Sequence, residues 1–402
     1  MGPSDRLVNS SLLTVRLLRQ LDADAGQQLV RRVAELASTL APWQVLERLH
    51  RDTPADLCRA AVSLHDARQA AVEKFGALAA NMFFDSEAVQ MASSAAIASH
   101  RASRFVEGEP VADVTCGVGA DALALGRRGP VAASDLDRAR VWMTQRNAES
   151  AGLGTRVIVS CADAVAPPTG CRALFADPAR RKGGQRVRRG SDYSPSLEQI
   201  CALRPQLTSL AVKISPALDE AQIPPSVDEV EYVSWRGQCR EAVLWFGATA
   251  GAKRRATVIG GGSLCWDEVL PPQVGVGAIG AFLYDPDPAV VRSHLVGLLA
   301  EQLQATLVAD QVAYLTSAVE KVTPFARCFR VLAQVPFNLR RLRQQLDAEG
   351  WRPQEILRRR FPIEPPALRR DLQGAGREGS QIVSLVCTRV AERPVVFICD
   401  PR

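Results

Sequence analysis

Hydrophobic and polar positions change their period along the chain. From about residue 5 to residue 80, apolar positions recur at helical spacing, as in LVRRVAELASTLAPWQVLERL, which predicts a helical region. From Val111 onward, short apolar runs alternate with helical segments such as RARVWMTQRNAESAG, and these runs are VADVT, VAASD, RVIVSC, ALFAD and LAVKIS. This alternation predicts an α/β fold with a Rossmann-like, doubly wound parallel sheet.

The pattern changes again after the fifth strand. VEYVSW, REAVLWFG and RRATVIG follow one another with short turns, which predicts an antiparallel edge on the sheet. After the glycines at 260–262, helices alternate with strands and the chain ends in SQIVSLVCTRV and PVVFICD, which predicts a separate α+β domain. We therefore expect a helical region over 1–80, the sheet domain over 81–262 and the α+β domain over 263–402.

Composition narrows the class of protein. The chain is 47% hydrophobic and 23% charged, and it lacks a run of eighteen apolar residues, so we expect no membrane span. The N-terminus has no basic stretch followed by an apolar core, which favours a cytoplasmic protein. The 10 cysteines are scattered without a CxxC pair, so we expect reduced thiols and no metal site. The net charge of +6 is a mild indication of a polyanionic partner.

The stretch VADVTCGVGADALALG carries the first candidate chemistry. Gly117 and Gly119 follow a predicted strand and precede a helix, which is typical of a turn that approaches a nucleotide cofactor closely. Asp113, four residues before Gly117, favours an ammonium group over a pyrophosphate. Asp135 ends the next strand and is placed to bind ribose hydroxyls, and Asp163 follows the third strand and is placed to meet an adenine amino group.

These residues resemble the class I S-adenosylmethionine-dependent methyltransferases. The resemblance rests on the order of Asp113, the two glycines, Asp135, Asp163 and the turn DPAR, over roughly residues 80–260. It implies S-adenosylmethionine as the cofactor. The alternative is a nicotinamide-binding Rossmann domain, which gives no reason for Asp113 or for the DPAR turn.

The turn DPARR after the fourth strand is the candidate catalytic element. Related methyltransferases with a DPPY or NPPF turn hold an acceptor amine there, and the resemblance implies this role for Asp177 and Pro178. The sequence departs from that pattern, because alanine replaces the second proline and Arg180 replaces the aromatic residue. Because a guanidinium is able to stack on a base or to bind phosphate, we expect Arg180 to orient the acceptor in one of these two ways. Arg181 is a candidate substrate contact. The alternative is a structural turn with an internal salt bridge.

The next strand, in LAVKISPALD, offers Lys213 as a substrate contact but no cysteine. This excludes the covalent mechanism of the RNA 5-methyluridine enzymes, whose turn is DPPR. The alternative for Lys213 is an ion pair with a nearby carboxylate such as Asp219.

Most of the chain resembles a bacterial group of S-adenosylmethionine methyltransferases with a THUMP-like C-terminal domain. The resemblance rests on NMFFDSEA, DPARR, VKISPALD, GQCREAVLWFG and FLYDPDPAV. It implies an RNA acceptor, a tRNA or an rRNA, and the late basic segment with Arg358 and Arg359 agrees with phosphate contacts. The alternatives are a small-molecule or protein acceptor, or an RNA-binding protein without catalytic activity.

Overall fold

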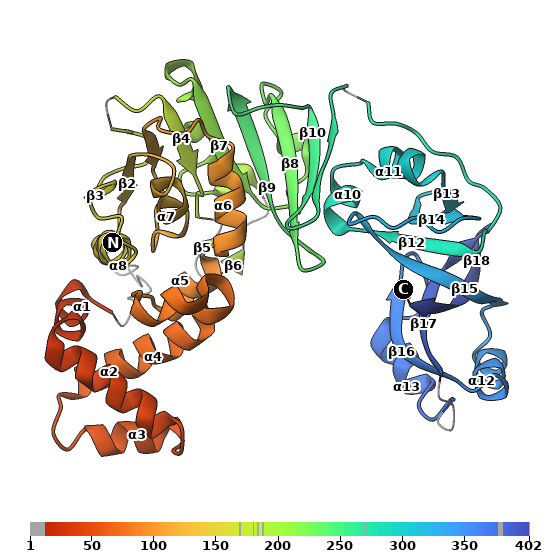
Figure 1. Ribbon diagram of the computed structural model, residues 1–402, viewed down its shortest axis with the longest axis horizontal. Helices are drawn as coiled ribbons and strands as arrows, with labels where there is room; N and C mark the ends of the chain where they lie inside the picture. Colours follow the sequence, from red (N-terminus) through yellow and green to blue (C-terminus); the bar gives the residue numbers. More distant parts are fainter. Residues whose placement is uncertain are drawn as a thin grey trace, which may run out of the picture. The chain divides into compact units, whose positions relative to one another are not determined.

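The computed structural model describes residues 13–168, 170–179, 181–182, 185–186, 189–268, 270–376 and 381–401. The chain divides into two compact units (Figure 1). The first comprises Met1–Asp228 and Val243–Gly251, and the second comprises Glu229–Ala242 and Ala252–Arg402. The boundaries expected at residues 80 and 262 stay predictions.

The first unit begins with helices, as expected from the apolar spacing. They are α1 (Val15–Asp22), α2 (Asp24–Ala37), α3 (Pro42–Leu49), α4 (Ala55–Phe75), the 3-10 helix η1 (Gly76–Asn81), α5 (Ser86–Met91) and α6 (Ala95–Ser103). Polar caps set several starts: the Asp85 carboxylate accepts from the amide of Ala88 at 2.7 Å, and the Ser94 hydroxyl accepts from the amide of Ile97 at 3.4 Å. The helix α4 ends at Gly76, whose φ is +59°.

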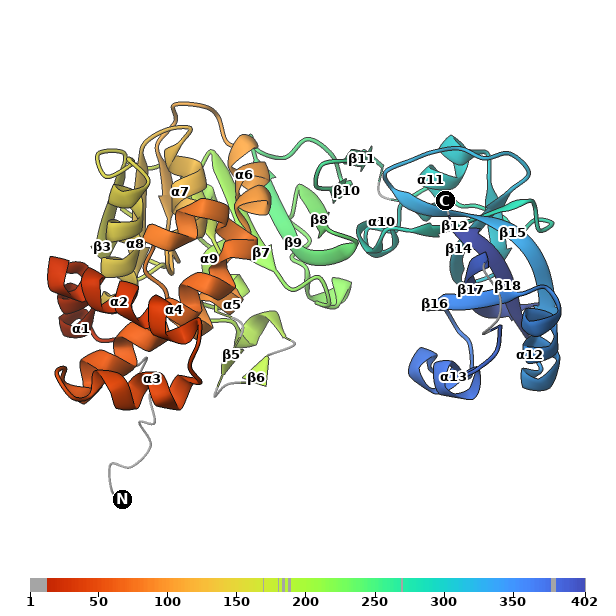
Figure 2. The same cartoon turned by 60° about the horizontal axis from the view of Figure 1, so that its bottom comes forward.

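A parallel sheet follows these helices (Figure 2). Its elements in the first unit are β1 (Val111–Asp113), α7 (Ala120–Gly126), β2 (Val131–Asp135), α8 (Arg138–Ser150), β3 (Val157–Cys161), β4 (Ala173–Ala176) and β7 (Ser209–Ile214). The strand order is β3-β2-β1-β4-β7, and every neighbouring pair among them is parallel. This confirms the expected α/β fold class. The order reverses direction beside β1, so the carboxyl ends of β1, β2 and β4 meet at a topological switch point.

The sheet continues through β9 (Gln238–Gly247), β8 (Glu229–Trp235), β10 (Arg254–Val258) and β11 (Gly262–Trp266), in that spatial order. The expected antiparallel edge is correct only in part. The strand β10 pairs with β8 in parallel, from Arg254↔Val230 to Val258↔Ser234, and β11 pairs with β10 antiparallel. Because β9 and β10 lie on opposite sides of β8, the connection from β9 to β10 passes β8. The short segment between the two strands in the sequence did not indicate this crossing.

Short elements connect β4 to β8. They are β5 (Arg181–Lys182), β6 (Gln185–Arg186), the 3-10 helix η2 (Gly190–Asp192), α9 (Leu197–Cys201), and the 3-10 helices η3 (Arg204–Gln206) and η4 (Glu220–Gln222). The strands β5 and β6 form a hairpin of their own. No helix in the described residues is long and apolar enough to cross a membrane.

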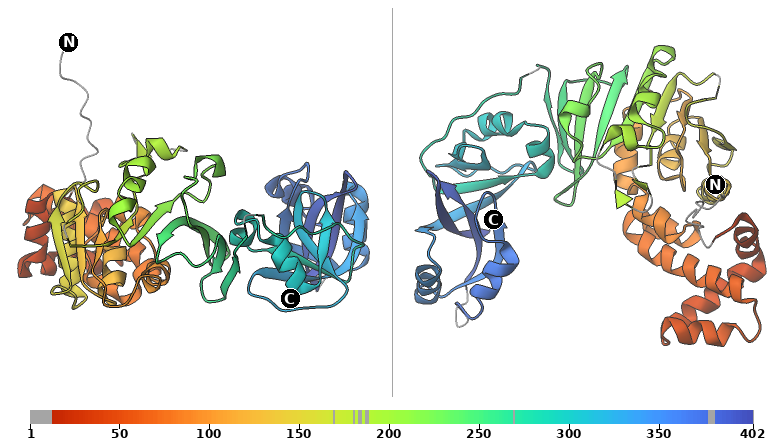
Figure 3. Two further views of the ribbon diagram at one scale, coloured as in Figure 1. Left: turned by 90° about the horizontal axis from the view of Figure 1, so that it is seen from above. Right: turned by 180° about the vertical axis from the view of Figure 1, so that it is seen from behind.

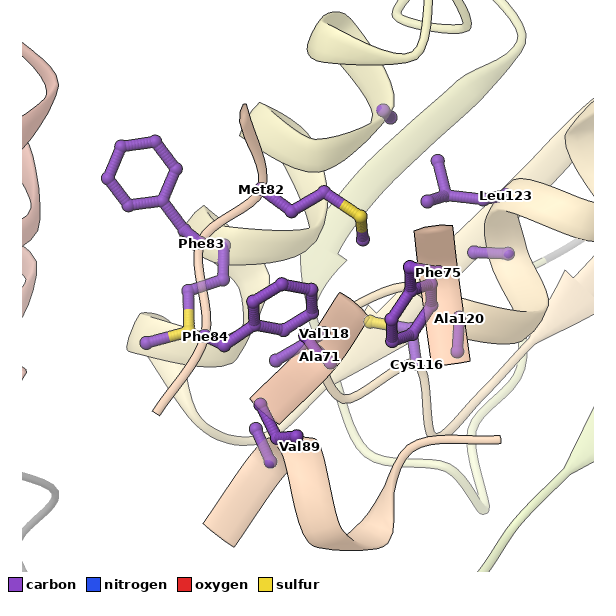
Figure 4. Close-up of a cluster of buried hydrophobic side chains, with 14 of the residues drawn as sticks. Ala71, Phe75, Met82, Phe83, Phe84, Val89, Cys116, Val118, Ala120 and Leu123 are labelled. Atoms are coloured by element: carbon purple, nitrogen blue, oxygen red, sulfur yellow. The ribbon is translucent and has the colours of Figure 1, made fainter. Parts of the chain in front are cut away.

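A buried cluster joins the N-terminal helices to the turn after β1 (Figure 4). Phe75, Phe84 and Met82 come from the helical region, and Cys116 and Val118 come from the turn. The rings of Phe75 and Phe84 lie 5.3 Å apart. Since these side chains leave water together, the cluster fixes the helical region against the turn.

The second unit contains a seven-stranded sheet of order β13-β14-β12-β15-β18-β17-β16 (Figure 3). Its elements are β12 (Phe282–Pro286), α10 (Pro288–Arg292), α11 (Val296–Leu303), β13 (Thr306–Ala309), β14 (Val312–Ser317), β15 (Ala326–Pro336), α12 (Leu339–Ala348), β16 (Trp351–Arg358), α13 (Pro365–Asp371), β17 (Gln381–Val390) and β18 (Arg393–Pro401). The two final strands, expected from the sequence, pair with each other antiparallel. Leu342 and Leu346 of α12 and Leu368 of α13 are buried in one cluster with residues of β17 and β18.

Candidate functional site

The turn between β1 and α7 needs its two glycines. Gly117 has a φ of +55° and Gly119 a φ of +89°, a region that L-residues with side chains rarely adopt. A Cβ on Gly119 would lie 3.1 Å from Cγ2 of Thr144, whereas one on Gly117 would meet nothing within 4 Å. The Thr144 hydroxyl donates to the carbonyl of Gly117 at 2.8 Å. The turn therefore brings bare backbone to the end of β1.

Buried Asn147 fixes this turn to the helical region. Its Nδ2 donates to the carbonyls of Val118 at 2.9 Å and Phe83 at 3.1 Å, and its Oδ1 accepts from the amide of Phe83 at 2.7 Å. Sequence reasoning missed Asn147, because its partners lie 29 and 64 residues away. The side chain satisfies buried backbone groups on both segments and so holds them together.

A cavity of about 520 Å³ opens beside the turn. Its size is typical of small-molecule and cofactor sites. It is lined by α5 and the residues after it, the glycine turn and the start of α7, the residues at and after the ends of β2 and β3, the DPA turn, and residues before and within α9. Six acidic residues line it: Glu87, Asp121, Asp135, Asp137, Asp163 and Asp177. Asp135, Asp163 and Asp177 were predicted from the sequence, and the other three were not.

Asp135 at the end of β2 is held in place by backbone donors. Its Oδ2 accepts from the amide of Gly117 at 3.0 Å, and its Oδ1 accepts from the amide of Asp137 at 2.9 Å. Burial raises the pKa of Asp135 above its ordinary value, while these two amides act in the opposite direction. The two bonds orient the carboxylate at the cavity wall, where the sequence placed a ribose contact.

Asp163 lines the cavity together with apolar residues. It accepts from the amide of Val165 at 3.1 Å, and the apolar lining residues next to it and after β2 are Leu136, Ala162, Ala164 and Val165. Leu136 is 69% exposed, which is unusual for a leucine beside a buried strand. An apolar wall next to a carboxylate suits a flat ring with an amino group. The sequence signal that could have identified this wall is an apolar residue directly after the strand-end Asp135.

Asp113 lies in the interior instead of on the cavity wall. Its Oδ1 accepts from the amide of Thr115 at 3.3 Å, and its Oδ2 is buried without a hydrogen-bond partner among the described residues. Burial, with the neighbouring charges of Asp121, Asp177 and Asp135, raises the pKa of Asp113 well above its ordinary value. Gly119 likewise supports the turn without lining the cavity. Direct contact of Asp113 with a cofactor stays a prediction.

Asp177 follows β4, which flanks β1 on the side opposite to β2 and Asp135. The amide of Asp177 donates to the Thr115 hydroxyl at 2.6 Å, and Lys213 of β7 donates from Nζ to its Oδ2 at 2.5 Å. Lys213 is buried, with only 4% of its side chain exposed, and its role as a substrate contact stays a prediction. Its ion-pair partner is Asp177, whereas the sequence had suggested Asp219.

Ser93, which lines the cavity, extends this network. Lys213 donates to the Ser93 hydroxyl at 3.3 Å, and Arg101 of α6 donates to it at 2.6 Å. Arg101 also donates from Nε to Oδ1 of Asp121 at 3.0 Å. The pairs Lys213–Asp177 and Arg101–Asp121 therefore meet at one hydroxyl. Sequence reasoning singled out neither Ser93 nor the ion pair of Arg101.

The rest of the DPARR turn is described in part. Pro178 is buried and Ala179 lines the cavity, exchanging backbone hydrogen bonds of 2.9 and 3.0 Å with Ser194. Arg180 lies outside the described residues, and of Arg181 the backbone alone is described, in β5. Their roles at the site stay predictions.

The two arginines predicted in the second unit have partners of their own. Arg358 donates from Nε to the carbonyl of Phe361 at 2.8 Å and pairs with Glu364 at 2.6 Å. Arg359 pairs with Asp285 at 2.8 Å, and its guanidinium lies over the ring of Tyr314 at 5.1 Å. Substrate binding by these two residues stays a prediction.

The residues of the cavity fit S-adenosylmethionine. Asp135, Leu136 and Asp163 line this cavity, and the ribose contact of Asp135 and the adenine contact of Asp163 stay predictions. The backbone of Gly117 leaves open the space that a side chain would fill. Among the described residues, no three His, Cys, Asp or Glu side chains gather as a metal site requires.

Known proteins share this sequence and fold. Residues 326–401 match the family model described as THUMP domain-like. A protein from Porphyromonas gingivalis W83, named as a methyltransferase, has a crystal structure with a TM-score of 0.69. It is 18% identical and covers 93% of this chain and 98% of its own, which shows the shared fold.

Two curated relatives come from Mycobacterium tuberculosis, strains CDC 1551 and H37Rv, and both are named uncharacterized S-adenosylmethionine-dependent methyltransferases. Each is 35% identical over 348 residues, which are 83% of this chain and 94% of the relative. With the cavity and its carboxylates, this match shows that the chain belongs to the S-adenosylmethionine-dependent methyltransferases.

Proposed function

We propose that this methyltransferase modifies structured RNA, a tRNA or an rRNA. The observation that carries the proposal is the THUMP domain-like match over residues 326–401, since THUMP domains are associated with RNA-modifying enzymes. The exposed arginines of this region support it. Arg340 and Arg341 of α12 and Arg369 and Arg370 of α13 are exposed, and phosphate contacts need accessible cations.

The helix α12 explains why its arginines remain exposed. Leu342 and Leu346, four residues apart on one face, are buried, which leaves Arg340 and Arg341 on the solvent side. For phosphate binding, these positions are better candidates than Arg358 and Arg359, whose guanidinium groups pair with carboxylates of the same unit.

The cavity would serve methyl transfer by positioning. S-adenosylmethionine supplies an activated methyl group, so the chain has to align the acceptor with it and exclude water. In this proposal Asp135, Asp163 and the Gly117 backbone bind the cofactor, and Asp177 accepts a hydrogen bond from the acceptor. Lys213 and Thr115 hold Asp177 from two sides, which restricts its orientation.

A thiolate nucleophile is not part of this mechanism. Cys116 lines the cavity, but burial raises the pKa of its thiol well above the ordinary value, and the charges of Asp113 and Asp135 raise it further. The thiol therefore stays protonated at neutral pH. Methyl transfer would then be direct, without a covalent intermediate on the protein, and the part of the chain would be to orient the acceptor through Asp177.

Labelled methyl transfer tests the proposal. Purified protein and radiolabelled S-adenosylmethionine are incubated with RNA, protein and small-metabolite fractions from cells that lack the gene. We expect label in one RNA size class, and label only in protein or metabolites would contradict an RNA acceptor. We expect Asp177→Ala to lower transfer by about 100-fold or more while S-adenosylhomocysteine binds within about threefold of the unchanged protein.

The matched control is Asp219→Asn, an exposed carboxylate on the segment that follows β7. It removes a similar charge outside the cavity and should leave transfer unchanged. Transfer that survives Asp177→Ala would contradict the assignment of Asp177 as the acceptor-orienting residue.

A further inference from the structure

Ser93 occupies an unusual position between two cations. It lies between α5 and α6, is 7% exposed and lines the cavity. Its hydroxyl oxygen accepts from Nη2 of Arg101 at 2.6 Å and from Nζ of Lys213 at 3.3 Å. A guanidinium and an ammonium donate hydrogen bonds and cannot accept them, so both contacts fix Ser93 as the acceptor.

The hydrogen of this hydroxyl is therefore unused by the protein. A serine hydroxyl has two acceptor positions and one donor. Arg101 and Lys213 occupy both acceptor positions, and among the described residues nothing accepts the Ser93 hydrogen. Because Ser93 lines the cavity, the hydrogen is available to a bound molecule. Two cationic donors also polarise the O–H bond and make it a stronger donor.

The position of Ser93 is fixed by the residues around it. Lys74 of α4 donates from Nζ to the carbonyls of Val89 at 2.7 Å, Gln90 at 3.1 Å and Ala92 at 2.7 Å, which holds the end of α5. Ser94 caps α6 on the other side. The hydroxyl is thus set in place before any ligand binds, and a preorganised donor loses little entropy on binding.

We infer that Ser93 donates its hydroxyl hydrogen to the carboxylate of the methionine part of S-adenosylmethionine. Asp135 and Asp163, at the ends of β2 and β3, suit the ribose and adenine parts, whereas Ser93 contacts Lys213 of β7, three and four strands away in the sheet order. The remaining strong acceptor on the cofactor is its carboxylate, and the Ser93 hydroxyl, polarised by Arg101 and Lys213, is a donor that suits it. Ser93 is then a cofactor-binding residue supplied by the helical region, and this role does not depend on which molecule is methylated.

Calorimetric binding of two ligands tests this role without measuring transfer. One ligand is S-adenosylhomocysteine, and the other is its decarboxylated form, which keeps the adenosine, thioether and amine. We expect Ser93→Ala to weaken S-adenosylhomocysteine binding by about 5- to 20-fold and to change the binding of the decarboxylated ligand by less than about twofold. Ser93→Thr, which keeps a hydroxyl, should retain more of the preference for the carboxylate.

Ser134→Ala is the matched control. Ser134 is 2% exposed in β2, and it does not line the cavity, so its loss should leave both affinities unchanged. An equal loss of both ligands in Ser93→Ala would overturn the inference, because it would indicate a general distortion of the site. Unchanged affinity for S-adenosylhomocysteine would overturn it as well, and an accompanying change in the KM for the acceptor would assign the donor to the substrate instead.

Discussion

The charged side chains singled out in the two units differ in what they contact. In the first unit, Asp135, Asp163 and Asp177 come from separate strand ends and line one cavity. In the second unit, Arg358 and Arg359 lie side by side in the sequence, and each pairs with a carboxylate of the same unit. Charged residues far apart in sequence thus form a site, while an adjacent pair is used internally.

Topology explains the difference. The strands of a parallel sheet end at the same edge, so an aspartate after each strand reaches the same crevice whatever its distance in sequence. A run of arginines carries no such constraint, because each long side chain pairs with whichever carboxylate the fold brings near it, Glu364 for Arg358 and Asp285 for Arg359. Strand-end position is therefore better evidence for a site than local charge density.

The largest effect expected from this comparison is at Asp135. Asp135→Ala removes a carboxylate that two backbone amides orient, and a charged hydrogen-bonding group at a ligand contributes on the order of 2–3 kcal/mol. We expect S-adenosylhomocysteine to bind about 100-fold more weakly, measured by calorimetry. Asp219→Asn, outside the cavity, is the control, and an affinity loss of less than about threefold at Asp135 would contradict its place in the site.

Sequence patterns predicted the residues that line the cavity better than the residues that hold them in place. Asp135, Asp163, Asp177 and Gly117 were found because each belongs to a strand end or to a turn with a known spacing. The supports have partners that are remote in sequence: Lys74 reaches the end of α5, and Asn147 joins Phe83 to the turn. Such pairings follow from packing, which a single sequence does not reveal.

The same limit explains the differences in the sheet and in the second unit. The crossing of β10 to the far side of β8 follows from strand order, which turn length alone does not set. The partners of Arg359 come from β12 and β14, which lie 74 and 45 residues earlier in the chain. Local composition identified the arginines correctly but gave no information about the carboxylate and the ring that meet them.

A pH-dependent effect is expected at Asp113. The pKa of Asp113 is raised in the folded protein, so above pH 3.8, its ordinary pKa, the unfolded chain loses a proton that the folded protein keeps. The contribution of Asp113 to the free energy of unfolding is therefore complete below pH 3.8. It decreases by about 1.4 kcal/mol per pH unit as the pH rises toward the raised pKa. Asp113→Asn should remove this decline, so the melting temperature of the unchanged protein should fall relative to that of the variant.

Thermal unfolding between pH 4 and pH 8 checks this expectation, without added cofactor. Parallel pH profiles for the two proteins would contradict a retained proton on Asp113. Cofactor binding by Asp113→Asn gives a separate answer, because a large loss of affinity would show that the buried carboxyl contributes to the site despite its position off the cavity wall.

The smallest expected effect returns the comparison to the second unit. Arg359→Ala removes a half-buried ion pair with Asp285 and the contact with Tyr314, for which about 1 kcal/mol of unfolding free energy is expected. This should lower the melting temperature by about 2–4 °C. Exposed Arg341→Ala should leave it unchanged and weaken RNA binding, with a shallower dependence on salt. A larger loss of RNA binding in Arg359→Ala than in Arg341→Ala, at unchanged stability, would show that the paired Arg359 contacts RNA. Local charge density would then be as good an indicator of a binding site as strand-end position.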